Sequence, residues 1–199
     1  MMDGPRTPDA IAELTARIRD GDERAFRALF DALHGPLLRF ALATVRDAAV
    51  ADDLVQEAFV RTWDRRATLD VAQPLRAYLY RTVRNLAFNH LRNDQTRERL
   101  LDDVTVVDSA AVPRARISPQ DRLAGLELGA ELARLIRILP PRQREALTLS
   151  RIQGLSHDEV AHVMGCAPRT VNNHLVAALA ALRRQLTSAL VASLAWMLT

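Results

Sequence analysis

The sequence predicts an all-α protein made of two small helical domains joined by a flexible linker. Apolar residues recur at helical spacing over most of the chain, and strand patterns are nearly absent. Periodicity fails over residues 94–119, where small residues, mixed charges and two prolines gather. We therefore expect an N-terminal domain over residues 1–93, a linker over 94–119 and a C-terminal domain over 120–199. With 199 residues and 49% hydrophobic content, the chain is able to bury a core.

Three helices are expected before residue 65. The first opens at Pro8, since proline is favoured at the first helical position, and Gly21-Asp22 ends it. The second runs over about 23–45, with a kink or interruption at Gly35-Pro36. The third begins near Ala48 and has an apolar stripe on one side. Its other face is polar and carries Asp52, Asp53, Gln56, Glu57 and Arg61.

The next helix is expected over residues 75–92, after a loop over 65–73 that ends before Pro74. Its polar stripe is rich in amides and arginines, the side chains that pair with base edges. Phe88 lies within this stripe, where it is able either to stack on a base or to pack inside the protein. The stripe consists of Arg81, Asn85 and Asn89 at i, i+4 and i+8, flanked by Arg84, Phe88 and Arg92.

The clearest C-terminal signal is a helix-turn-helix over residues 155–186. Ser156 and Glu159 form the S-x-x-E pattern of a capping box, Gly165 is suited to end the helix, and Pro168 is suited to begin the next. In such motifs the second helix usually enters the DNA major groove. Two more helices are expected before it, over 120–139 and 142–153.

Charge is distributed unevenly along the chain although the net charge is only +3. Residues 1–64 hold 8 Arg and 12 acids, residues 65–93 hold 6 Arg and one acid, and residues 131–199 hold 8 Arg and 4 acids. An acidic section followed by two basic ones implies at least two kinds of binding surface. The single cysteine, the lack of a signal-peptide pattern and the lack of an apolar run near 20 residues predict a cytoplasmic protein without membrane insertion.

Three segments, in this order, resemble one family. They are DDLVQEAFVRTW (52–63), LRAYLYRTVRNLAFNHLR (75–92) and LPPRQREALTLSRIQGLSHDEVAHVMGCAPRTVNNHL (139–175). Together they resemble bacterial RNA polymerase sigma factors of the extracytoplasmic-function (ECF) type, over about residues 25–93 and 125–186. The chain departs from the family pattern at Tyr78, where Trp is frequent, at Phe88, which is often polar, and over 176–181, where basic residues are usual.

The resemblance implies an alternative sigma factor that binds core RNA polymerase and promoter DNA under the control of an anti-sigma factor. The core-binding face would comprise Asp52, Asp53, Gln56, Glu57 and Val60. The −10 element would be opened and read by Arg81, Asn85, Asn89 and Phe88, with Arg84 and Arg92 on phosphates and Arg65, Arg66 and Thr68 around a flipped base. The −35 element would be read by Pro168, Arg169, Thr170, Asn172, Asn173 and His174, with Arg142, Arg144 and Arg151 as further phosphate anchors.

Other interpretations remain open at this stage. Asp52 and Asp53 can simply be solvated acids at a helix start, and Phe59 and Trp63 are expected in the core rather than at an interface. The whole chain can be a sigma mimic that sequesters an anti-sigma factor, or a helix-turn-helix repressor. The tail over 186–198, LTSALVASLAWML, continues the last helix and can pack on its own domain, dock a regulatory partner or contact a membrane.

No catalytic or metal-binding pattern is found, so we expect neither an enzyme nor a cofactor. His157 and His162 stand at i and i+5, which does not place them on one helix face as a zinc protease requires. Cys166 lacks an identifiable base beside it. Catalysis is expected to belong to the polymerase.

Overall fold

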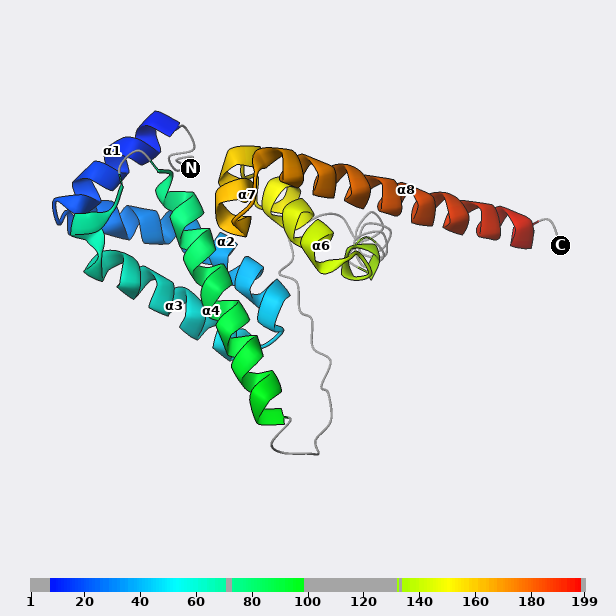
Figure 1. Cartoon of the computed structure of the whole chain (residues 1–199), viewed down its shortest axis with the longest axis horizontal. Coiled ribbons are helices and arrows are strands. Elements are labelled where there is room, and N and C mark those ends of the chain that lie inside the picture. Colours follow the sequence, from blue (N-terminus) through cyan, green and yellow to red (C-terminus); the bar gives the residue numbers. More distant parts are fainter. Residues whose placement is uncertain (1–7, 71–72, 99–131, 133, 198–199) are drawn as a thin grey trace, which may run out of the picture. The chain divides into compact units, whose positions relative to one another are not determined.

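The structure is a computed structural model that describes residues 8–70, 73–98, 132 and 134–197 (Figure 1). Those residues form helices and connecting turns without a strand, which confirms the all-α prediction. They group into two compact units: the first holds the described residues up to 98 together with His162–Gly165, and the second holds the remaining described residues after 131. Most of the predicted linker and of the helix expected over 120–139 lies outside the described residues.

The N-terminal domain packs its helices around one apolar core. Helix α2 packs against both α3 and α4, α3 packs against α4, and α1 covers α2 and α4. Leu37, Val55, Leu79 and Tyr80 are fully buried, and the Tyr80 ring meets Phe40 edge to face at 5.4 Å between centroids. The elements are α1 (Pro8–Arg19), α2 (Glu23–Val45), α3 (Ala48–Asp64), the 3₁₀ turn η1 (Arg66–Thr68) and α4 (Leu75–Glu98).

Two helix starts in this domain, those of α2 and α3, are capped by aspartates. The Asp22 side chain accepts hydrogen bonds from the backbone N–H groups of Arg24 and Ala25, at 2.9 and 3.0 Å, and so caps α2. Its other carboxylate oxygen accepts from the Arg17 guanidinium at 2.7 Å. The Ala25 N–H and then the Arg17 side chain hold the pKa of Asp22 below its ordinary value. Asp47 caps α3 in the same way, since it accepts from the Val50 N–H at 3.0 Å.

Helix α2 runs through Pro36 without a break, so of the two alternatives expected at Gly35-Pro36 the interruption is wrong and the kink stays a prediction. A proline inside a helix removes one backbone donor, and packing against the neighbouring helices outweighs that loss. By length and composition alone, α2 is long and apolar enough to cross a membrane, whereas no segment of that kind was expected. Its buried residues, Ala25, Leu29, Leu37, Phe40 and Ala41, are those of a core helix.

Helix α4 continues to Glu98, six residues past the predicted end at Arg92. The segment over 93–98 contains neither glycine nor proline, and Gln, Arg and Glu are good helix formers. The prediction ended the helix where the apolar stripe ended. A helix end made of good helix formers does not need an apolar stripe to continue.

The C-terminal domain contains the predicted helix-turn-helix, and among the described residues a helical stretch over 134–137 and an irregular helix precede it. The single helix expected over 142–153 is instead α6 (Pro141–Leu147) followed by the π-helical turn η2 (Thr148–Ile152), in which the Gln153 N–H donates to the Thr148 carbonyl at 2.9 Å. Helix α6 packs against α8 (Pro168–Met197), and α7 (His157–Met164) is the first helix of the motif. The buried residues of this domain include Leu147, Leu149, Val171, Leu175 and Leu182.

The predicted caps of the motif are confirmed. The Ser156 N–H donates to Glu159 Oε2 at 2.8 Å, and the Glu159 N–H donates to Ser156 Oγ at 3.2 Å, which is a reciprocal capping box. Gly165 ends α7 with a φ of +64°, a backbone conformation that glycine adopts without strain. Helix α8 begins at Pro168 and extends to Met197, so the tail continues the last helix as predicted. What the tail side chains contact lies outside the described residues.

Substitution Ser156→Ala is expected to lower the free energy of unfolding of the C-terminal domain by about 1 kcal/mol. The change removes the acceptor for the Glu159 N–H and leaves the exposed residues at the start of α8 untouched. Thermal unfolding of the whole chain measures the loss. Ser156→Asp restores a capping oxygen and is expected to recover most of the stability, whereas an unchanged unfolding temperature in the alanine variant would contradict the capping role.

Candidate functional site

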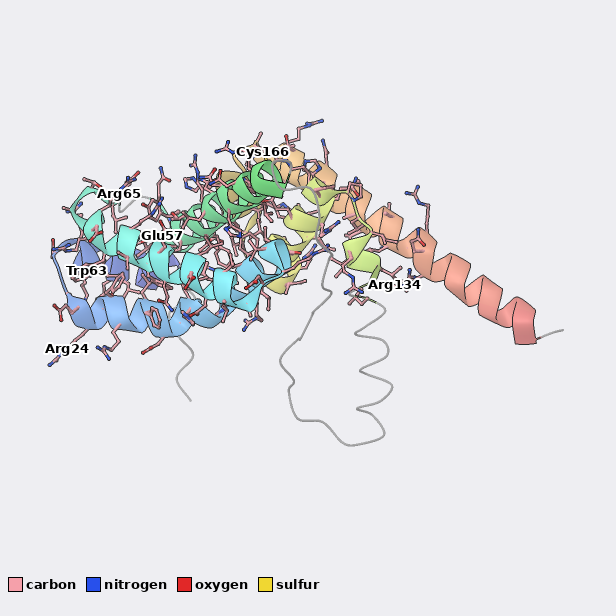
Figure 2. The ribbon with its side chains drawn as sticks, turned by 90° about the horizontal axis from the view of Figure 1, so that it is seen from below. Arg24, Glu57, Trp63, Arg65, Arg134 and Cys166 are labelled. Carbon is pink, nitrogen blue, oxygen red and sulfur yellow. The ribbon has the colours of Figure 1, made fainter. Side chains whose placement is uncertain are left out.

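Helix α3 has one buried and one exposed face. Asp53, Gln56, Glu57 and Val60 are exposed and Asp52 is partly exposed, so the predicted core-binding residues lie together on the outer side. Figure 2 shows Glu57 on this helix. Gln56 Nε2 donates to Asp52 Oδ2 at 2.6 Å, and the Arg61 guanidinium pairs with Glu57. Val60 is 59% exposed within this polar surface.

An aromatic cluster joins α2 and α3 behind that face. Phe59 is buried at 3% exposure, as predicted, and it meets the rings of Phe26 and Phe30 at 6.0 and 4.8 Å. Trp63 is half-buried and lies between α3 and α2, with its ring 4.9 Å from that of Phe26 (Figure 2). The cluster fixes the orientation of α3, and thereby the direction in which its acidic face points.

Arg66 contacts this cluster and is not among the residues that line the pocket described below. Its guanidinium lies 4.5 Å from the centre of the Trp63 ring, and its Nη1 donates to the Trp63 carbonyl at 2.9 Å. Both contacts are made by the guanidinium group of Arg66. Arg66 thus anchors the η1 turn to the end of α3.

The other predicted loop residues do meet the polar stripe of α4. Arg65, Thr68 and Asp70 form part of the lining of one pocket, together with three residues of α4, here called the inner row: Arg81, Asn85 and Asn89. Thr68 Oγ1 donates to the Arg65 carbonyl at 2.9 Å, which fixes the turn. The pocket combines positive charge with amide donors and acceptors. That combination suits a nucleotide, whose phosphate is anionic and whose base edge is polar.

A second set of α4 residues, here called the outer row, runs beside the inner row and consists of Arg84, Phe88 and Arg92. Phe88 is 45% exposed, so the alternative that it packs in the core is excluded. The Arg84 guanidinium lies 4.7 Å from the centre of the Phe88 ring. Arg92 Nη2 donates to Asn89 Oδ1 at 3.3 Å and links the two rows.

The first turns of α8 present the predicted −35 residues. Val171, Leu175 and Ala178 are buried on one side, which leaves the opposite side for contacts. Val176 is 59% exposed one turn after Asn172, and its i+4 spacing from Asn172 places it on the same face of α8. Pro168, Arg169, Asn172 and Asn173 are exposed, and Thr170 and His174 are half-buried.

The three arginines before α7 that are predicted to contact phosphates differ in their exposure and in their side-chain partners. Arg151 is exposed on the π-helical turn. Arg142 is exposed, with Nη1 3.6 Å from Glu145 Oε2. Arg144 is half-buried, and its Nη2 donates to the Leu139 carbonyl at 2.9 Å, so it fastens the chain before α6. Across the described ranges no three His, Cys, Asp or Glu side chains gather as a metal site would need.

Comparisons with known proteins give the family. The family profile described as "Sigma-70 region 2" matches residues 29–97, and "Sigma-70, region 4" matches residues 129–182. The chain is 32% identical over 158 residues to the "ECF RNA polymerase sigma factor SigL" of Mycobacterium tuberculosis, covering 79% of this chain and 86% of that protein. It is 29% identical over 184 residues to the "RNA polymerase sigma-H factor" of Pseudomonas aeruginosa, covering 90% and 95% of the two chains.

A comparison with solved structures supports the same fold. The structure of CnrH in complex with the cytosolic domain of CnrY matches with a TM-score of 0.65 and 27% identity, over 90% of this chain and 99% of that one. The matched regions include α3 and α4 in the N-terminal domain and the helix-turn-helix in the C-terminal domain. The chain therefore belongs to the ECF RNA polymerase sigma factors.

Proposed function

We propose that this sigma factor divides promoter recognition among three surfaces: the outer face of α3 binds core RNA polymerase, α4 and the loop before it open and read the −10 element, and the start of α8 reads the −35 element. The observation that carries the proposal is the pocket where Arg65 and Thr68 meet the inner row. Residues from two separate elements converge there with the chemistry of a nucleotide site.

This pocket would account for strand opening without a chemical energy source. Opening is favoured only if the protein binds the separated strand more tightly than the duplex, by an amount that outweighs the lost pairing and stacking. A pocket that receives a single base provides this difference, because a paired base cannot enter it. Asn85 and Asn89 would pair with the edge of that base, and Arg65 and Arg81 would neutralise the adjoining phosphates.

The face of α3 suits a basic partner helix on core polymerase. Its acids Asp53 and Glu57 provide charge complementarity, and Val60 provides an apolar centre that binding would bury. Charge on this face would speed and orient the encounter with core polymerase, while burial of Val60 would add affinity for it. Gln56 and Asp52 are already hydrogen-bonded to each other, so they present a preorganised surface.

The start of α8 carries few charged residues and would read base edges mainly through amide side chains. Asn172 and Asn173 are exposed, and an asparagine amide pairs with N6 and N7 of adenine in the major groove. Phosphate contacts would come from Arg142, Arg151 and Arg169, which are exposed. This supports a modest contribution of the C-terminal domain to affinity, with most of the opening energy supplied by the N-terminal domain.

The function itself is regulatory, since the polymerase performs the chemistry. CnrH was solved with the cytosolic domain of CnrY bound. We infer that this chain is likewise held inactive by an anti-sigma factor, and that it acts in the cytoplasm, where polymerase and promoter are.

Run-off transcription with core RNA polymerase tests the proposal. Genomic fragments are transcribed with core enzyme alone and with core enzyme plus this chain. A start site that depends on the chain is the expected result. If no fragment of its own genome gives such a start, while the chain still binds an anti-sigma factor, the protein is a sigma mimic and the proposal fails.

A further inference from the structure

Three exposed apolar residues follow one side of α8, after the residues proposed to read the −35 element. Val176 is 59% exposed, Leu179 is 38% exposed and Leu186 is 41% exposed. Intervals of three and seven residues place these side chains in line along the helix, whereas Leu175 and Leu182 beside them are buried. The described part of the C-terminal domain therefore leaves this side of α8 open to water.

The sequence continues the same line of apolar residues toward the end of α8. The helix runs without a break to Met197 (Figure 1). Leu190, Leu194 and Met197 follow Leu186 at intervals of four, four and three residues. We call these four residues the tail stripe. Residues four apart form a ridge on a helix, and such a ridge packs into the groove of a second helix.

The composition around the tail stripe indicates what kind of surface covers it. Residues 185–199 contain no Asp, Glu, Lys or Arg, so charge complementarity does not select a different protein or an anionic lipid surface. The uncharged segment is also shorter than the roughly 20 residues that span a bilayer. An apolar, uncharged surface is complementary in its chemistry to a second copy of itself.

The spacing of the tail stripe is symmetric about its second residue. Leu186 and Leu194 lie four residues from Leu190 on either side, and Arg183 and Met197 lie seven residues from it. Two antiparallel copies that cross at Leu190 would place Leu186 of one copy against Leu194 of the other. Parallel copies would instead bring the two Arg183 charges together, which is unfavourable. In the antiparallel pair, the apolar stem of Arg183 would lie against Met197 while its guanidinium stays in water.

We propose that free copies of this chain pair through antiparallel tail stripes, with Leu190 at the two-fold axis. Residues 183–197 of each copy supply the contact, which is less than the roughly 20–30 residues a side of a stable interface. The dimer is therefore weak, with a dissociation constant of about 10 μM. The residues proposed to read the −35 element end at His174, outside this contact, so the pairing is independent of promoter recognition.

Sedimentation velocity of the full chain, measured from about 1 to about 100 μM, tests the pairing. The wild type is expected to change from monomer to dimer over that range. Leu186→Glu places an unpaired charge in the contact and is expected to raise the dissociation constant about a hundredfold. Gln185→Glu is the matched control, because it adds the same charge at an exposed neighbouring position off the tail stripe, and it is expected to dimerise as the wild type does.

The outcomes of sedimentation decide the proposal. Thermal unfolding checks that Leu186→Glu folds as the wild type does, which its exposure leads us to expect. Equal dimerisation of this variant and the wild type would place the contact elsewhere and overturn the proposal. A wild-type chain that stays monomeric to about 100 μM would also overturn it. If that monomer sediments with phosphatidylglycerol vesicles, a membrane covers the tail stripe instead.

Disulfide cross-linking tests the orientation of the two copies. The variants are made with Cys166→Ser, which removes the native thiol. Leu190→Cys is expected to cross-link two copies, whereas Arg183→Cys is not, because antiparallel pairing holds the two 183 positions apart. Cross-linking at both positions would show parallel pairing and overturn the antiparallel arrangement.

Discussion

Substitution Val60→Asp is expected to lower the affinity for core RNA polymerase by about a hundredfold. Val60 is 59% exposed among the acidic residues of the α3 face, so the free domain tolerates the change at little cost. In the proposed complex this position becomes the apolar centre of the interface. An aspartate there would be desolvated without a partner, which costs several kcal/mol. Competition against a labelled reference sigma factor for core enzyme measures the loss.

Ala49→Asp provides a matched control on the same helix. It introduces the same charge at another exposed position of α3, but in the first turn, where a negative charge interacts favourably with the helix dipole. We expect this variant to bind core enzyme as the wild type does. If both aspartate variants lose affinity equally, the effect is one of overall charge and Val60 is not at the centre of an interface.

Local signals were predicted well because their causes lie within a few residues. The capping box joins Ser156 and Glu159, which are three residues apart. The glycine cap and the start of α8 depend on the backbone preferences of Gly165 and Pro168 themselves. The same holds for the inner row, since its i, i+4, i+8 spacing alone places three side chains on one helix face. Its meeting with Arg65 and Thr68 was expected only through the family resemblance.

Features that depend on packing between elements were missed or left open. Arg66 and Arg65 are neighbours of the same type in the sequence, yet Arg66 lies on Trp63 while Arg65 lines the pocket. The continuity of α2 through Pro36 likewise depends on α3 and α4, which bury its apolar face. Phe88 was undecided between core and surface, because helical spacing gives the face of a residue but not how far the neighbouring helix extends to cover it.

Substitution Asn85→Ala is expected to reduce transcription from a promoter of this sigma factor by about ten- to a hundredfold. Asn85 is exposed in the pocket with Arg65 and Arg81, and loss of an amide that pairs with a base edge costs about 1–3 kcal/mol. Run-off transcription at a mapped promoter measures the effect. Asn93→Ala is the control, since Asn93 is exposed on the same side of α4 but one turn beyond Asn89, the last α4 residue that lines the pocket.

The base that Asn85 reads can be identified from the same variant. If the amide pairs with one −10 base, replacing that base lowers wild-type transcription, while Asn85→Ala holoenzyme is indifferent to the replacement. The two losses would then not add, as is expected for partners in direct contact. Full additivity at every −10 position would show that Asn85 supports the pocket without touching a base. Base recognition would then rest on Asn89, for which the same cycle with Asn89→Ala gives a separate answer.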